Sequence, residues 1–138
     1  MRGTPEIAVV DTHALIWWLT GTMRRLGRGA RAFFDLVDDG RAVACIATVS
    51  LVELSEAIQS GGVSLGRPFG EFVEHLDAVP SRYNVVLLSP AIVSRAHDLF
   101  EIPERGDRLI AATACELGLP LVTRDPEIAR AASVQVVW

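Results

Sequence analysis

The sequence alternates between short, mostly apolar runs and longer segments with helical periodicity. The runs cover residues 7–10, 42–47, 85–88, 121–123 and 134–137. A strand that is apolar on both sides fits a parallel sheet covered by helices on both faces. In a sheet with one solvent-exposed face, apolar and polar residues alternate strictly along each strand. The pattern therefore predicts an α/β fold with a mostly parallel central sheet.

The segments between these runs carry the spacing of amphipathic helices. Helices are predicted over residues 12–19, 29–39, 49–59, 68–79, 90–100, 106–117 and 126–132. A strand followed by one or two helices, repeated along the chain, is typical of parallel sheets. With no internal repeat and no linker, residues 1–138 are interpreted as one domain.

Composition and charge narrow the classes of protein that fit. Half of the residues are hydrophobic and 22% are charged, which excludes a disordered chain. The apolar runs are too short to cross a membrane and the first residues lack a signal peptide, so a cytoplasmic protein is predicted. A net charge of −4, from 17 acids and 13 bases, argues against simple electrostatic binding of nucleic acid.

Four acids stand where parallel strands end or helices begin. Asp11 follows the first apolar run, Glu53 lies inside an apolar helix, Asp107 begins a helix, and Asp125 follows the run at 121–123. Taken singly, the three aspartates could be helix caps and Glu53 could be a partly buried ion pair. Ligands of such folds bind beyond the carboxyl ends of the strands, where several of these acids are expected to meet.

A cluster of carboxylates is suited to binding a divalent cation. Like charges repel one another, so the cluster needs a cation, and Mg²⁺ and Mn²⁺ prefer oxygen ligands. Such a metal activates water and stabilises charge on a phosphate. The acids therefore favour metal-dependent hydrolysis of a phosphodiester. The two cysteines have no Cys or His neighbours at the spacing of a structural zinc site.

Four segments together resemble a known family. They are VVDTHALIWWLTG with Asp11, ATVSLVELSEAI with Glu53, GDRLIAATACELGLPLVTRD with Asp107, and the TRD that ends at Asp125. The sequence resembles PIN-domain ribonucleases and, among them, the VapC-type toxins of prokaryotic toxin–antitoxin systems. The segment IPERG before Asp107 departs from the Asp-Pro-containing version of the family.

The resemblance implies a fold, an activity and partners. It implies a three-layer α/β/α sandwich and metal-dependent endonucleolytic cleavage of RNA. Asp11, Glu53, Asp107 and Asp125 would bind Mg²⁺ or Mn²⁺, and Thr123 would support the site by hydrogen bonding. The resemblance also implies a homodimer and a cognate antitoxin.

Arginines near these segments are candidates for substrate binding. Arg24, Arg25 and Arg28 lie in a stretch without acids, while Arg108 and Arg124 adjoin the proposed metal ligands. All five could contact RNA phosphates. The first three could equally form a solvated face, and the last two could merely pair with the neighbouring acids.

Two other functions fit parts of the pattern. A non-catalytic binding module would keep the fold and use the acids structurally. An Asp-dependent phosphate-transfer protein would also place an aspartate after a strand. The second is disfavoured because the chain has no lysine and because His13 replaces the second acid of an Asp-x-Asp motif.

Overall fold

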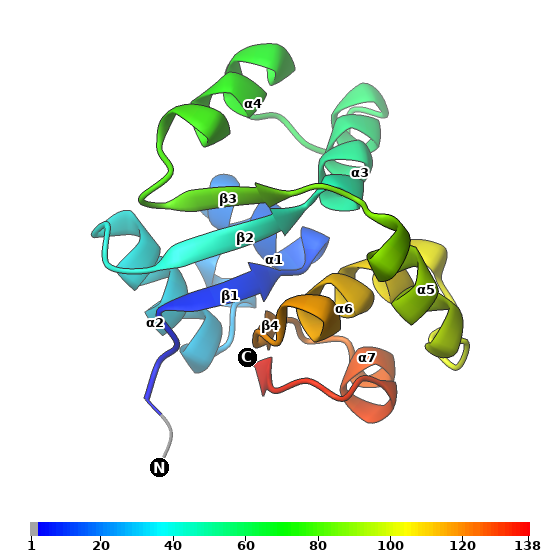
Figure 1. Ribbon diagram of the computed structural model, residues 1–138. Helices are drawn as coiled ribbons and strands as arrows, with labels where there is room; N and C mark the ends of the chain where they lie inside the picture. The colour runs from blue at the N-terminus through cyan, green and yellow to red at the C-terminus, as the bar shows by residue number, and fades with distance from the viewer. Residues whose placement is uncertain (1–2) are drawn as a thin grey trace.

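The computed structural model describes residues 3–138 and contains a five-stranded sheet. The strands are β1 (Ile7–Val10), β2 (Val43–Ala47), β3 (Tyr83–Val86), β4 (Leu121–Val122) and β5 (Val136–Val137). Their order is β3-β2-β1-β4-β5 and every pairing is parallel (Figure 1). The predicted parallel sheet is thereby confirmed.

Seven α-helices and one short 3-10 helix are present in the described residues. They are α1 (Thr12–Leu19), η1 (Met23–Arg25), α2 (Arg28–Asp38), α3 (Thr48–Gln59), α4 (Phe69–Ala78), α5 (Pro90–Asp98), α6 (Arg105–Leu117) and α7 (Pro126–Ala131). Each agrees with a predicted helix to within about two residues, apart from η1. Between residues 3 and 138, no helix has the length and apolar character needed to cross a membrane.

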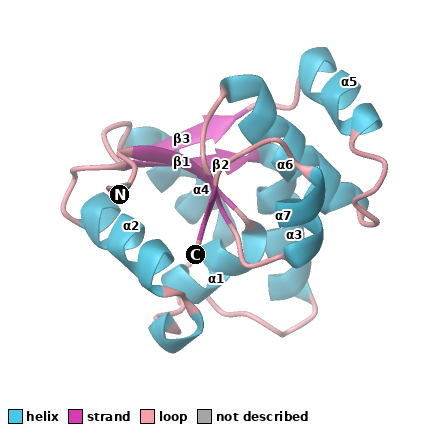
Figure 2. Cartoon of the chain, turned by 90° about the horizontal axis from the view of Figure 1, so that it is seen from below, coloured by secondary structure: helices cyan, strands magenta, loops and turns pink. Residues whose placement is uncertain are grey.

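The strands bury side chains on both faces, which produces the three layers. Val10 belongs to a core shared with Phe33 and Phe34 of α2, whereas Val9 belongs to a second core shared with Ile110 of α6. Successive strand residues point to opposite faces, so adjacent valines serve different cores. Figure 2 shows helices on both sides of the sheet, as expected for an α/β/α sandwich.

The third strand departs from its prediction. It covers Tyr83–Val86 instead of residues 85–88, since Ala44 to Ala47 of β2 pair with residues 83–86. Leu87 and Leu88 lie beyond the strand and are 75% and 52% exposed. Apolar character alone therefore placed this strand two residues too late, because pairing with β2 sets the register.

The topology brings distant parts of the chain to one place. Strands β1 and β4 are neighbours in the middle of the sheet and run in the same direction. The segments that leave their carboxyl ends, at Asp11 and Thr123, are joined because Asp11 N donates to Val122 O at 2.9 Å. Helix α3 begins directly after β2, at the same edge.

Candidate active site

Asp11 lies at the centre of this edge and is only 5% exposed. It occupies the position before α1, but its side chain does not cap that helix. Instead, its Oδ2 accepts a hydrogen bond of 2.6 Å from the Thr123 hydroxyl. The capping explanation for Asp11 is therefore wrong, and the predicted hydrogen bond from Thr123 to a carboxylate is present.

Asp125 combines a structural contact with a place in the same cluster. Its Oδ1 accepts a hydrogen bond of 2.8 Å from Glu127 N and thereby caps α7. Its own backbone N donates to Thr123 Oγ1 at 3.1 Å. Thr123 is fully buried, so one hydroxyl fixes Asp11 and the backbone of Asp125 relative to each other.

Asp107 enters the cluster from the first turn of α6, whose capping position belongs to Glu104. The pKa of Asp107 is raised to about 7, first by burial and then by the charges of Asp11 and Asp125. A hydrogen bond with the Asp125 carboxyl group and the charge of Glu104 raise this pKa further. Burial is the largest cause of this shift, and the neighbouring carboxylates add a repulsion that a bound cation would relieve.

Glu53 is held beside the cluster by a different set of contacts. Its Oε1 accepts a hydrogen bond of 2.6 Å from the Thr12 hydroxyl, which also lies 3.0 Å from Ser50 Oγ. On its other side, a Cβ atom on Gly106 would lie 2.5 Å from Glu53 Oε2. The carboxylate is thus confined between α1, its own helix and the start of α6.

The close packing of Glu53 on Gly106 makes Gly106→Ala an informative change. Alanine stabilises a helix by about 0.5–1 kcal/mol relative to glycine, so the folded chain should tolerate it. The added methyl group displaces the Glu53 carboxylate, and for a chain that cleaves RNA, as its resemblance implies, we expect the rate of cleavage to fall at least about tenfold. Cleavage of a labelled RNA and a thermal melt measure the two effects.

Gly70→Ala is the matched control, because Gly70 also lies in a helix and a Cβ atom there would meet nothing within 4 Å. Full activity of the Gly106→Ala variant would show that the position of Glu53 does not matter for the reaction.

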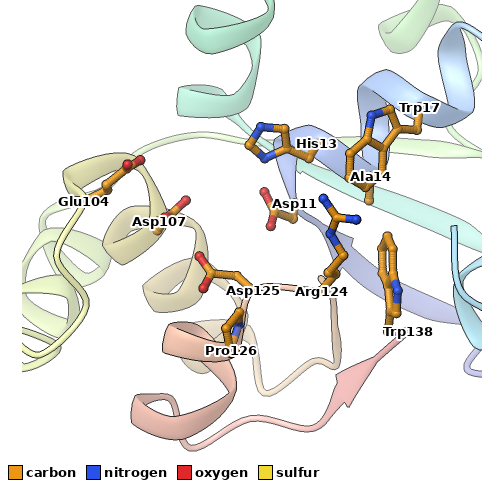
Figure 3. Close-up of a pocket in the computed structure, with 10 residues that line it drawn as sticks. All are labelled: Asp11, His13, Ala14, Trp17, Glu104, Asp107, Arg124, Asp125, Pro126 and Trp138. Atoms are coloured by element: carbon orange, nitrogen blue, oxygen red, sulfur yellow. The ribbon is translucent and has the colours of Figure 1, made fainter. Parts of the chain in front are cut away.

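A pocket of about 270 Å³ opens where the aspartates meet (Figure 3). Its lining consists of Asp11, His13, Ala14, Trp17, Glu104, Asp107, Arg124, Asp125, Pro126 and Trp138. The carboxylates of Asp11, Asp107 and Asp125 face a common space in Figure 3. Glu53 is not part of the lining, so the pocket brings together three of the four predicted acids.

Glu104 and Trp138 are among the lining residues that the sequence did not single out. Glu104 stands three residues before Asp107, one helical turn away, and that spacing was a usable signal. Trp138 gave no signal, because its place depends on the pairing of β5 with β4.

The candidate arginines divide into separate groups. Arg108 donates to Ile102 O at 2.8 Å and to Pro103 O at 3.0 Å, so it holds the loop before α6. Arg124 lines the pocket, and its guanidinium carbon lies 4.5 Å from the centre of a Trp17 ring. Within residues 3–138, ion pairs form only between Arg95 and Glu116 and between Arg130 and Glu127. Neither Arg108 nor Arg124 therefore forms an ion pair with the acids.

The remaining three arginines belong to η1 and the start of α2. Arg24 and Arg25 lie in η1, and Arg25 is 5.7 Å from the centre of a Trp17 ring. Arg28 begins α2 and lines a separate hollow with Arg31 and Asp35. Of these three, Arg25 therefore lies over the ring of a residue that lines the acidic pocket.

The donor set suits a hard divalent cation. Asp11, Asp107 and Asp125 offer carboxylate oxygens, and burial together with the charges of Asp11 and Asp125 raises the pKa of Asp107. Across residues 3–138, no three acids, histidines or cysteines are already close enough to form a metal-binding group. A cation that retains several water molecules, as Mg²⁺ does, needs fewer protein ligands than such a group supplies.

The comparisons with known proteins agree with this architecture. A family model described as PIN domain matches residues 8–134. No curated protein matched the sequence.

Similar solved structures come from several bacteria. VapBC2 from Rickettsia felis, bound to a promoter DNA fragment, is 18% identical with a TM-score of 0.66, over 94% of this chain and 96% of that one. DNA-bound VapBC from Salmonella typhimurium is 19% identical with a TM-score of 0.62, over 95% and 96%. A toxin–antitoxin complex from Klebsiella pneumoniae is 21% identical with a TM-score of 0.56, over 86% of each chain. At these identities the likeness establishes the fold.

Proposed function

The chain belongs to the PIN-domain family, and from this premise we propose that it is a metal-dependent endoribonuclease, the toxin of a toxin–antitoxin pair. One observation carries the proposal: three aspartates from separate elements share a pocket, where burial first and then the charges of Asp11 and Asp125 raise the pKa of Asp107 to about 7. A structural cluster would be expected to include a neutralising arginine or lysine. This arrangement is instead suited to a divalent cation and the phosphate of a substrate.

We assign the cation, Mg²⁺ or Mn²⁺, to the pocket of Asp11, Asp107 and Asp125, where one or two carboxylates would bind it directly and the others through its water molecules, with Glu53 acting from the side of α3. When bound, it supplies an activated water molecule and stabilises charge on the phosphate. The chain's own residues prepare this pocket. Thr123 orients Asp11 by donating a hydrogen bond, and Thr12 orients Glu53 in the same way.

Metal removal tests the activity directly. Purified protein with Mn²⁺ should cleave total RNA at internal positions, and EDTA should abolish cleavage. Adding Mn²⁺ in excess over EDTA should restore the activity, since the carboxylates cannot bind the phosphate without a cation. Sequencing of the new RNA ends measures the reaction. Cleavage that persists in EDTA would refute metal dependence. Absence of both Mn²⁺ binding and cleavage would favour a non-catalytic binding module.

The proposed toxin role implies a protein partner and a location in the cell. Several similar structures are VapBC or toxin–antitoxin complexes, and this supports a cognate antitoxin. An RNA substrate implies action in the cytoplasm. Co-purification with the product of an adjacent reading frame tests the partner. Failure to obtain a complex from the co-expressed pair would count against it.

We also propose a homodimer. Exposed apolar side chains follow β3 and continue onto α5, including Leu87, Leu88 and Val93, and Phe100 beyond α5 is 76% exposed. Large exposed apolar side chains gathered in this way are typical of protein interfaces. Light scattering distinguishes a mass of two chains from a mass of one, and a monomer at micromolar concentration would contradict the proposal.

A further inference from the structure

The pocket has two chemically different walls. Asp11, Asp107 and Asp125 form one wall, and Trp17, Arg124 and Trp138 form the other. Figure 3 shows the two tryptophans and Arg124 together on the side away from Asp107. The acids have a role with the cation in the proposed reaction. The aromatic wall has no role in that chemistry and needs a separate explanation.

Arg124 is held as a planar cation and not as a partner of the acids. Its guanidinium carbon is 4.5 Å from the centre of a Trp17 ring, which is a cation–π distance. The side chain of Arg124 is exposed, whereas Trp17 is only 8% exposed. Core packing therefore explains Trp17, but it leaves unexplained why an exposed arginine stacks on that ring beside unneutralised carboxylates.

Trp138 is fixed by contacts that leave little freedom. Gly29 N donates to Trp138 O at 3.0 Å, and a Cβ atom on Gly27 would lie 2.4 Å from the Trp138 carbonyl carbon. Its indole meets Trp17 edge-on, with 6.0 Å between ring centres. The start of α2 thus accommodates Trp138 through glycines, and its partly exposed ring closes the pocket.

We propose that Arg124 and Trp138, supported by Trp17, form a stacking subsite for one base of the RNA next to the cleaved phosphate. Unstacked RNA bases bind to aromatic rings and to the plane of an arginine guanidinium. Stacking does not require net positive charge, so it provides affinity in a pocket whose acids repel phosphates. This inference rests on the proposed function, because the acids define the place of the phosphate.

In this subsite, Arg124 and Trp138 position the substrate. Tight binding of RNA then requires a base as well as the phosphate. A simple phosphate contact by Arg124 would depend on charge alone, and lysine would replace it. A stacked guanidinium would not be replaced by lysine, whose ammonium is a point charge without a plane.

The test compares two single-stranded oligomers of ten nucleotides with equal phosphate charge. One is oligoadenylate RNA and the other has the same ribose-phosphate chain without bases. Binding is measured by anisotropy with Ca²⁺ in place of Mn²⁺ to slow cleavage. We expect the wild-type protein to bind oligoadenylate about tenfold more tightly than the abasic oligomer, as one stacked base predicts.

Three variants locate that preference. Arg124→Lys should lose most of the tenfold preference for oligoadenylate, because lysine keeps the charge but has no plane that stacks on a base. Trp138→Leu should lose the preference as well, and Trp138→Phe should retain most of it. Arg130→Lys is the matched control, since Arg130 is exposed and pairs with Glu127 outside the pocket.

Several outcomes overturn the inference. Equal binding of the two oligomers by the wild type would exclude a stacking subsite, as would an unchanged preference in Arg124→Lys. If Trp138→Leu has a much lower melting temperature than the wild type, the test of the subsite depends on Arg124→Lys alone. Arg124 is exposed, so its side chain can be replaced without loss of the fold. The proposed function is judged separately, by cleavage of RNA with Mn²⁺. A protein that prefers bases but cleaves nothing would refute the nuclease and keep the subsite.

Discussion

Replacing Asp11 with asparagine is expected to reduce RNA cleavage at least about 100-fold. Loss of groups that merely orient metal ligands costs about 10- to 100-fold in activity or metal affinity, and Asp11 is proposed as a ligand itself. Asparagine keeps an oxygen that accepts the hydrogen bond from Thr123, so the local geometry should survive. Initial rates on a labelled RNA with Mn²⁺ measure the effect.

The same Asp11 variant separates a functional acid from a structural one. Removing the charge of Asp11 relieves a repulsion that raises the pKa of Asp107, so the melting temperature in EDTA should stay equal or rise. Asp77→Asn, on an exposed position of α4, removes one charge elsewhere and should change neither property. Cleavage by Asp11→Asn at the wild-type rate would refute the assignment of the site.

Asp107 should make the stability of the metal-free protein depend on pH. Its pKa is about 7 in the folded chain and 3.8 is its ordinary value, so the folded state binds the proton more tightly. The stability that this proton provides is complete below pH 4 and is lost as the pH rises through 7. We expect the free energy of unfolding to fall by about 1–2 kcal/mol between low pH and pH 8 because of Asp107. This is less than the difference between the two pKa values would give, because solvent screens a partly exposed side chain.

Asp107→Asn isolates this contribution, since asparagine resembles the protonated acid and can still donate to Asp125. In EDTA, the variant should melt at nearly the wild-type temperature at pH 5 and about 5 °C higher at pH 8. Mn²⁺ should stabilise the wild type at pH 8 and the variant much less, because binding to the folded state alone raises stability. If the difference in melting temperature between the two proteins stays the same from pH 5 to pH 8, Asp107 does not titrate in this range.

The sequence predicted the sheet and the identity of the acids more successfully than the contacts among them. Apolar runs predicted four of the five strands nearly in place, because strands buried on both faces have few alternatives. The exception was β3, where Leu87 and Leu88 extend the apolar run into solvent. An edge strand takes its register from one neighbour, and a pattern of hydrophobicity cannot specify that neighbour.

The contacts that the sequence could not predict depend on distant pairings. Glu53 is held by Thr12 and packed on Gly106, which lie in other helices. Arg108 was expected to bind substrate or pair with acids, but it binds carbonyls of its own loop. Trp138 reaches the pocket only because β5 pairs with β4. Such contacts follow from topology and packing, whereas residue type and local spacing were enough to single out the acids.

The hydrogen bond from Thr123 to Asp11 joins residues 112 positions apart in the chain. A chain synthesised only as far as Leu117 contains Asp11, Glu53 and Asp107, but it lacks β4, Asp125 and the Thr123 hydroxyl. Its acids cannot take up the arrangement of the finished pocket. If the protein cleaves RNA, the nascent chain therefore becomes active only late in synthesis. A truncated product would be inactive, and not merely a weaker nuclease. The order of the strands would thus set the point in synthesis at which the proposed nuclease becomes active.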